Sequence, residues 1–147
     1  MTRALSGADL AERINQAHPG TAVDSNQTDV WIELHSVLAV ARFLKEAEDL
    51  DFAFLTAITA VDYVDNFEII YHLLSMRRNH SAVLKMRCYG REEPIVDSVT
   101  GIWRGADLQE REIWDLMGVR FEGHPNMKRI LLWEGFPGHP LRKDFVR

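Results

Sequence analysis

The residues with the clearest potential for chemistry are two histidines, His124 and His139, each within a Gly-His-Pro triplet. Imidazole is a frequent zinc ligand, and a zinc site needs at least three protein ligands. Three carboxylates stand near the triplets in the sequence, Glu122, Glu134 and Asp144, so one interpretation is a small metal-dependent enzyme. No HxxxH or HExxH spacing is present, however. We therefore favour a second interpretation, in which each triplet forms a turn whose imidazole bonds to a backbone group or a carboxylate.

The other patterns for small-molecule chemistry are missing from the sequence. A single cysteine, Cys88, rules out an internal disulfide, a CxxC site and a cysteine-ligated iron–sulfur cluster. Its apolar neighbours predict a buried, inert thiol. Neither a GxSxG nucleophile elbow nor a GxGxxG or GxxxxGK[ST] phosphate loop occurs. We predict no catalytic, cofactor-binding or metal-binding residue in this chain.

A third pattern points to a protein partner. Arg111 and Asp115 are four residues apart, so the sequence predicts that they pair on one face of a helix. No opposite charge answers Glu112 in the same way, and Trp114 stands among charged residues, as tryptophan often does at interfaces. A half-buried core tryptophan and a solvated basic tail are the alternatives that this pattern leaves open. The tail contains the basic residues Lys128, Arg129, Arg142 and Lys143 within an otherwise acidic chain.

Composition sets the outer limits on function. The chain has 147 residues, of which 46% are hydrophobic and 27% charged, which is typical of one soluble globular domain. Its net charge of −5 argues against nucleic-acid binding, because polyanion binders are usually basic. No stretch approaches the roughly 20 apolar residues of a membrane-spanning helix, and residues 1–16 lack the apolar run of a signal peptide. We expect a cytoplasmic protein that meets a membrane only through a partner.

These residues must be positioned by a fold whose first half mixes helices and strands. Helical spacing of apolar residues predicts helices over 5–17 and 37–50, the second of them capped by Ser36. Between them, 21–23 and 29–35 flank a polar run and predict a β-hairpin. Further apolar runs rich in β-branched and aromatic residues predict strands at 52–64, 66–78 and 81–89, the last two adjacent in a meander. A helix over part of 52–64 is the alternative that its pattern leaves open.

The next stretch predicts two helices. A proline suited to a first turn and the spacing of the apolar residues predict a helix over 94–103. A second helix is predicted over 108–117. Asp107 and Glu110 have capping-box spacing at its start, and Gly118 is well placed to end it.

Beyond Gly118 the apolar period disappears. Prolines and glycines punctuate residues 119–147, which we call the strap, and the only regular element predicted in it is a short strand at 129–133. Prolines reduce the entropy that such a segment loses when it docks, here on an acidic neighbour. The predicted organisation is a single α+β domain over residues 1–118, with a mixed β-sheet covered by helices, followed by the extended irregular strap as a C-terminal docking segment.

The motifs of the last third resemble those of a known family. The stretch EREIWDLMGVRFEGHPNMKRILL, residues 110–132, followed by GHPLRKDF, residues 138–145, resembles the signature of the C subunit of respiratory complex I, the proton-pumping NADH:quinone oxidoreductase. The resemblance covers residues 52–145 well and the first fifty residues loosely. The chain departs from the family at WEGF, residues 133–136, where relatives commonly carry a Pro-Glu-Asp-Trp-like stretch.

The resemblance implies a role for the chain. A member of this family is a peripheral subunit of the hydrophilic arm that packs chiefly on the large subunit of the quinone cavity, on the cytoplasmic side of the membrane. It implies no cofactor in this chain, whereas FMN and iron–sulfur clusters would lie in other subunits. Electrons would pass from NADH, or another donor, to quinone, coupled to proton translocation. An equivalent subunit of a membrane-bound hydrogenase, the small metal-dependent enzyme described above and a free-standing binding module are the alternatives left open.

The residue pattern and the resemblance together predict a set of partner-binding residues. Those on the helix would hold the helix and the start of the strap, and those in the strap would contact other subunits. We expect Arg142→Glu to weaken assembly while the isolated domain stays folded. The predicted set is Glu110, Arg111, Glu112, Trp114, Asp115, His124, Lys128, Arg129, His139, Arg142, Lys143 and Asp144.

Overall fold

The computed structural model describes residues 2–146, so the strap is described as far as Val146. The chain forms eight strands, three α-helices and one short 3₁₀ helix within that range. They are β1 (Arg3–Ala4), α1 (Gly7–Ala17), β2 (Ala22–Ser25), β3 (Asp29–Ile32), η1 (Leu34–Ser36), α2 (Val37–Glu46), β4 (Phe54–Asp62), β5 (Phe67–Ser75), β6 (His80–Cys88), β7 (Ile95–Asp97), α3 (Ala106–Met117) and β8 (Arg120–Glu122).

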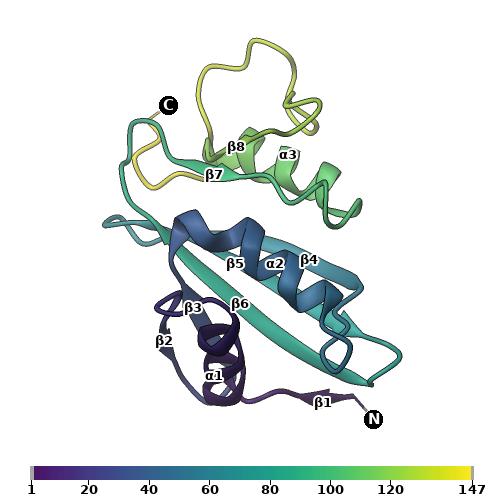
Figure 1. The fold of residues 1–147 in the computed structure, drawn as a ribbon. Coiled ribbons are helices and arrows are strands. Elements are labelled where there is room, and N and C mark those ends of the chain that lie inside the picture. The colour runs from purple at the N-terminus through teal and green to yellow at the C-terminus, as the bar shows by residue number, and fades with distance from the viewer. Residues whose placement is uncertain (1, 147) are drawn as a thin grey trace.

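The main sheet is mixed, with strand order β2-β3-β6-β5-β4 and β1 beside β6 (Figure 1). Both β1 and β3 run parallel to β6, whereas β2–β3, β4–β5 and β5–β6 are antiparallel. The predicted hairpin is β2–β3, and the two strands predicted to be adjacent in a meander are β5 and β6, which β4 extends on the other side of β5. The predicted α+β class with a mixed sheet and helices is confirmed.

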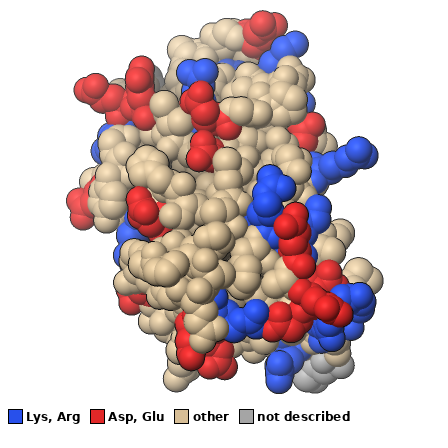
Figure 2. All heavy atoms as spheres, viewed as in Figure 1, with Lys and Arg blue, Asp and Glu red and all other residues tan. Residues whose placement is uncertain are grey.

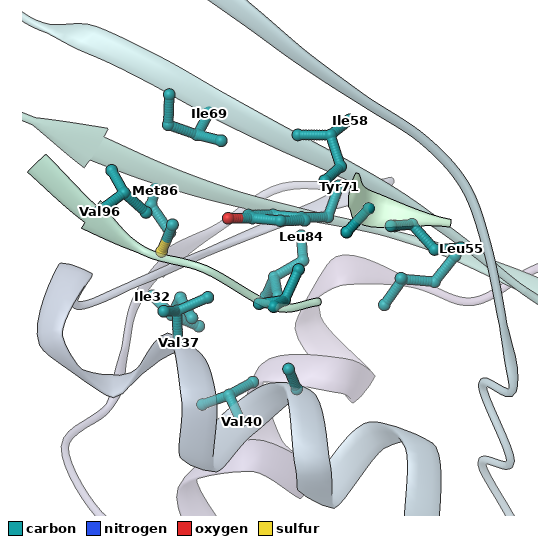
Figure 3. Close-up of a cluster of buried hydrophobic side chains, with 14 of the residues drawn as sticks. Ile32, Val37, Val40, Leu55, Ile58, Ile69, Tyr71, Leu84, Met86 and Val96 are labelled. Atoms are coloured by element: carbon teal, nitrogen blue, oxygen red, sulfur yellow. The ribbon is translucent and has the colours of Figure 1, made fainter. Parts of the chain in front are cut away.

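The core lies between one face of this sheet and the helices α1 and α2 (Figure 1). Along β5 and β6 every second side chain is buried, as the two-residue period of a strand requires. In Figure 3, Val37 and Val40 of α2 lie opposite Tyr71 and Leu84 of the sheet. Each fully buried side chain of this size contributes about 1.5–3 kcal/mol through the hydrophobic effect.

The two helices of the first half begin differently. The Ser6 hydroxyl accepts a hydrogen bond from the Asp9 N–H and so caps α1. The predicted cap of α2 is wrong, because the Ser36 hydroxyl bonds to the Glu33 carboxylate and not to the helix. Helix α2 also ends at Glu46 and not at residue 50.

Residues 94–103 correct a second prediction, because they do not form a helix. They contain β7, followed by turns. Strand β7 pairs in parallel with β8, which follows α3 in the sequence. Its burial alternates as in a strand, since Val96 is buried and Ile95 is exposed. The predicted strand at 129–133 is also wrong, because residues 130–132 are in bends, residues 129 and 133 have no regular structure, and the strand of this region is β8.

The unit β7–α3–β8 lies beside the main sheet, with α3 packed against β4, and the strap leaves it as an open arch (Figure 1). Acidic and basic side chains are interspersed on the face that Figure 2 draws, around a broad uncharged area. Within residues 2–146, no helix has both the length and the apolar character that crossing a membrane requires.

Candidate protein-interaction site

Helix α3 is the centre of the site because it carries two fully buried carboxylates, Glu110 and Asp115. The predicted capping box is wrong, since Glu110 turns away from the start of its own helix. Its Oε1 accepts a hydrogen bond from the Ser98 hydroxyl at 2.6 Å, and its Oε2 accepts one from the Val99 N–H at 2.8 Å. Glu110 therefore fastens the segment after β7 to α3.

The pKa of Glu110 reflects this environment. Burial raises it, the Ser98 and Val99 donors oppose that rise, and the net result is a pKa of about 7. The Tyr71 hydroxyl lies buried without a hydrogen-bond partner in the described part of the chain. Burial first, and then the charge of Glu110, raise the pKa of Tyr71 well above its usual value, so the phenol stays neutral.

Asp115 fixes the strap. Its Oδ2 accepts hydrogen bonds from three consecutive backbone N–H groups, those of Ile130, Leu131 and Leu132, at 3.1, 2.7 and 3.0 Å. Its Oδ1 accepts a fourth from the Arg129 guanidinium at 2.8 Å. Burial alone would raise the pKa of Asp115, but these four donors lower it to about 2. The carboxylate is thus ionised and fully satisfied.

The predicted pairing of Arg111 with Asp115 is therefore wrong. The Arg111 guanidinium instead donates to the backbone carbonyls of Lys128 and Arg129, at 3.1 and 3.0 Å. A carboxylate facing three ordered amides and an arginine has no need of a further partner on its own helix. Arg111 and Asp115 both hold the start of the strap, through separate contacts.

Arg129 connects α3 to a later part of the strap, residues 136–138. It donates to the Asp115 backbone carbonyl at 3.0 Å and to the carbonyls of Phe136 and Gly138 at 2.7 and 2.8 Å. Its guanidinium lies over the rings of Trp114 and Phe136, at 5.5 and 5.6 Å from their centroids. These contacts are cation–π interactions, which add to the hydrogen bonds.

The two histidines of the Gly-His-Pro triplets do not converge. His124 Nε2 lies 3.0 Å from both the carbonyl and the carboxylate of Asp107, and its Nδ1 accepts from the Asn126 N–H, which places the proton on Nε2. His139 Nδ1 donates to the Asp115 carbonyl at 2.9 Å, and its ring meets the edge of Trp114. Each imidazole thus bonds to a different end of α3, in the manner of the turn interpretation.

The metal-dependent alternative requires several ligands in one place. Across the residues that the structure describes, no group of three or more His, Cys, Asp or Glu side chains is arranged to hold a metal ion.

The end of the strap is fastened to the main sheet by a contact that sequence reasoning missed. Asp62 of β4 accepts two hydrogen bonds from Arg91, both at 2.8 Å, and one from the Lys143 N–H at 2.9 Å. The hydrogen bonds from Arg91 hold the pKa of Asp62 well below its usual range, although burial opposes them. Arg142 and Arg91 both bind Asp144, and Arg142 also donates to the Arg91 carbonyl. No local sequence signal links Asp62 or Arg91 to the strap, because both lie far from it in the sequence.

Arg142 is therefore already bonded within the chain. Its reversal to glutamate would place a second carboxylate beside Asp144 and remove the contact to Arg91. Such a variant would disturb the end of the strap itself, so it does not isolate docking to a partner.

The surface that the strap leaves free is mostly apolar. Ile130, Leu131 and Trp133, which we call the apolar ridge, are exposed, Leu131 by 62% and Trp133 by 65%. Beside it, Trp114, Met127 and Leu132 contribute to a hollow of about 350 Å³. Exposed apolar groups held in a fixed arrangement mark protein interaction sites. The sequence signal is the apolar run RILLW, which by itself predicts a strand. Of the predicted partner-binding residues, Glu112, Lys128, Lys143 and Asp144 are exposed.

Comparison with known proteins adds independent information. The family model described as "Respiratory-chain NADH dehydrogenase, 30 Kd subunit" matches residues 30–147. The chain is 46% identical over 112 residues to an NADH-quinone oxidoreductase C subunit, the one numbered 2, of Rhizobium meliloti (strain 1021), covering 74% of this chain and 60% of that relative. It is 39% identical over 148 residues to the NADH-quinone oxidoreductase C subunit of Roseiflexus sp. (strain RS-1), covering 96% of this chain and 84% of the relative.

A solved structure shares the fold. A chain in the structure of the membrane-bound sulfane sulfur reductase, an archaeal respiratory membrane complex, superposes with a TM-score of 0.77 at 24% identity. The match covers 95% of this chain and 85% of that one. At this identity the similarity shows the fold alone.

Proposed function

Because the chain belongs to the family of the 30 kDa subunit of respiratory-chain NADH dehydrogenase, we propose that it is a cofactor-free peripheral subunit of a complex I-type NADH:quinone oxidoreductase. Its role is structural: it helps to assemble the hydrophilic arm beside the quinone-reducing module. Its main partner is the large subunit that forms the quinone cavity, on the cytoplasmic side of the membrane. FMN and iron–sulfur clusters belong to other subunits, and the assembled complex couples electron transfer from NADH to quinone with proton translocation.

The observation that carries this proposal is the anchored strap. The fully buried Asp115 fixes the backbone of residues 130–132, so the side chains of the apolar ridge are attached to an ordered backbone. A surface that is ordered before binding loses less conformational entropy when it docks. An exposed tryptophan and leucine held in this way have the character of an interface hot spot.

The proposal is tested first at the level of the complex. Deleting the chromosomal copy should abolish NADH:quinone reductase activity in membranes, and a plasmid copy of this chain should restore it. Membranes that keep this activity after deletion would overturn the assignment to an NADH-fed complex. Because the fold is shared with a chain of a sulfane sulfur reductase, NADH and quinone should be assayed directly and not inferred from growth.

The docking role is tested by Trp133→Ala in the same strain. Loss of a hot-spot side chain costs about 2 kcal/mol or more, so incorporation of the chain into the purified complex should fall roughly 30-fold when the chain is limiting. The matched control is Tyr63→Ala, which removes an aromatic side chain of similar exposure, 52%, from the β4–β5 turn. Both purified variants should melt within about 2 °C of the natural chain, since neither side chain is in the core. Normal incorporation of Trp133→Ala would contradict the docking role.

A further inference from the structure

A second surface lies away from the apolar ridge, along β4. Strand β4 is the last strand of the main sheet, so one of its edges has no neighbouring strand. Between residues 57–60 of this strand and one side of α3 runs a groove of about 350 Å³, with Leu141 of the strap at its border. We call it the edge groove. Its apolar lining includes Ile58, Ile113 and Leu116.

The backbone of β4 presents hydrogen-bonding groups to this groove. In an antiparallel pair, the backbone N–H and C=O groups of every second residue bond to the partner strand. The backbone groups of the residues between them point to the opposite side, which on β4 is the free edge. The Tyr63 N–H bonds to the Asn66 carbonyl at 2.9 Å, so the odd-numbered residues just before it bond to β5. The backbone groups of Ile58 and Ala60 therefore face the free edge. The Ile58 N–H confirms this orientation, because it is bonded to the Gln109 side chain of α3 at 2.6 Å. Ala60 has the same orientation, and no other element within residues 2–146 bonds to its backbone.

The edge has only part of the usual protection against pairing. Free edges are commonly blunted by lysine, proline, a bulge or a very short strand. The opposite edge, β2, is four residues long and has an irregular register at Ala22–Asp24. Strand β4 is nine residues long and has neither lysine nor proline. Its register is irregular between Leu55 and Ala57, and Gln109 of α3 covers the edge at Ile58, but from there to Asp62 the strand is regular. A strand-like occupant would satisfy this edge.

The side chains of the groove indicate the chemistry of the occupant. Leu116 is half-buried and Glu112 is exposed, with no cation bonded to it in the described part of the chain. Leu108, one turn before Glu112, is 57% exposed and continues the same side of α3. Leu141 is 60% exposed, and its N–H is tied to the Leu116 carbonyl at 2.8 Å. The surface is therefore apolar with a single unpaired acid.

We infer that the edge groove receives an extended segment of a partner subunit, which adds to β4 as a further strand. The segment bonds to the backbone of Ala60, lays an apolar side chain against Leu116 and brings a lysine or arginine to Glu112. A second copy of this chain fits less well, because α3 packs against β4 and would meet the other strands of a second sheet. The inference rests on the proposed function, since it requires the chain to be a subunit.

Hydrogen exchange of the assembled complex tests the backbone part. The Ala60 amide should exchange at least tenfold more slowly in the detergent-solubilised complex than in the purified chain, because strand addition occupies it. The exposed turn at residues 76–79 provides an internal comparison for general effects of assembly. An unchanged exchange rate at Ala60 in a fully assembled complex would overturn the inference. That result would leave the proposed function intact, whereas a chain that never enters the complex would contradict the proposed function itself.

Charge reversal tests the side-chain part. Glu112→Lys should reduce incorporation into the complex about tenfold, and the reduction should shrink at high salt. The matched control, Glu12→Lys on the exposed side of α1, makes the same change in net charge and should incorporate normally. Equal incorporation of the two variants would overturn the assignment of a basic occupant. Oligomerisation of the purified natural chain through β4, seen as a dimer in solution, would point to a second copy as the occupant and would also overturn the inference.

Discussion

At the scale of single residues, two buried carboxylates on one helix differ in proton affinity because they face different numbers of donors. Glu110 meets one hydroxyl and one N–H, which leaves burial dominant and its pKa near 7. Asp115 meets three N–H groups and a guanidinium, and its pKa falls to about 2. The sequence identified both as important but assigned them the wrong neighbours. Helical spacing reveals which residues share a face of the helix. It cannot reveal that backbone N–H groups of other segments donate hydrogen bonds to these carboxylates.

Asp115→Ala should destabilise the protein by about 3 kcal/mol, because it leaves three partly buried amides without an acceptor and removes the carboxylate that faces Arg129. Urea unfolding at pH 7 measures this loss. Glu112→Ala is the matched control, since its side chain is exposed on the same helix, and it should change the free energy of unfolding by about 0.5 kcal/mol or less. Similar values for the two variants would show that the strap is not held by Asp115.

Glu110 makes the stability depend on pH near neutrality. Its folded pKa of about 7 lies above its unfolded value of about 4.3, so the folded state favours the protonated form. This contribution is complete below about pH 4 and is lost as the pH rises through 7, a change of roughly 4 kcal/mol. Glu110→Gln cannot titrate, so the natural chain should lose about this much stability relative to the variant between pH 4 and pH 8. A difference that is constant over this range would contradict a raised pKa.

At the scale of elements, the sequence predicted those whose pattern is local. The helices α1, α2 and α3 and the β4–β5–β6 meander follow from apolar periods that neighbouring residues complete. Residues 94–103 were misassigned because the spacing of Ile95, Val99 and Trp103 also fits a helix. Residues 95–97 form a strand because they pair with β8. Strand β8 follows α3 in the sequence, so the spacing of apolar residues around 95–97 does not reveal this pairing. The parallel pairing of β3 with β6 was beyond sequence reasoning for the same reason.

Gly118 shows an element boundary that the sequence did predict. It ends α3 with a φ of 78°, and a Cβ there would lie 2.8 Å from Cδ2 of His139. Gly118→Ala should therefore cost about 1–3 kcal/mol in strain and displace His139 from the helix end. Gly101→Ala is the control, because a Cβ at Gly101 meets nothing within 4 Å and should change stability little. Urea unfolding of both variants, with the histidine resonances of each by NMR, separates the two outcomes.

At the scale of the whole molecule, two of the four strap lysines and arginines predicted to bind a partner make side-chain bonds within the chain. Sequence reasoning gave them to a partner, but Arg129 and Arg142 direct their donors to carboxylates and carbonyls of the same chain. The sequence could not show this, because Asp62, the acceptor for the end of the strap, lies in the main sheet. Internal bonding of the charges leaves the apolar ridge and the edge groove as the surfaces free for partners. Whether the remaining exposed charges contact other subunits stays a prediction.

Acid should release the strap. The hydrogen bonds to Asp62, Asp115 and Asp144 lower the pKa of each, to about 2 for the last two, so their contribution is present above about pH 4 and is lost as the pH falls through the folded pKa. The amide resonances of Ile130, Leu131 and Leu132 should titrate together, with a midpoint near pH 2, in two-dimensional NMR spectra. A midpoint near pH 4 would show that these amides do not bond to an ionised Asp115.

The dependence of α3 on Arg129 and the amides after it has a consequence for biosynthesis. The ribosome completes the helix before it has added the residues that bind Asp115, so the nascent polypeptide holds a carboxylate whose partners are missing until residues 129–132 have been added. A product released early, before residue 129, would keep that charge beside an unfinished core and would be a good substrate for cellular proteases. Copies that end before residue 129 should therefore be degraded faster than copies that include the partners of Asp115.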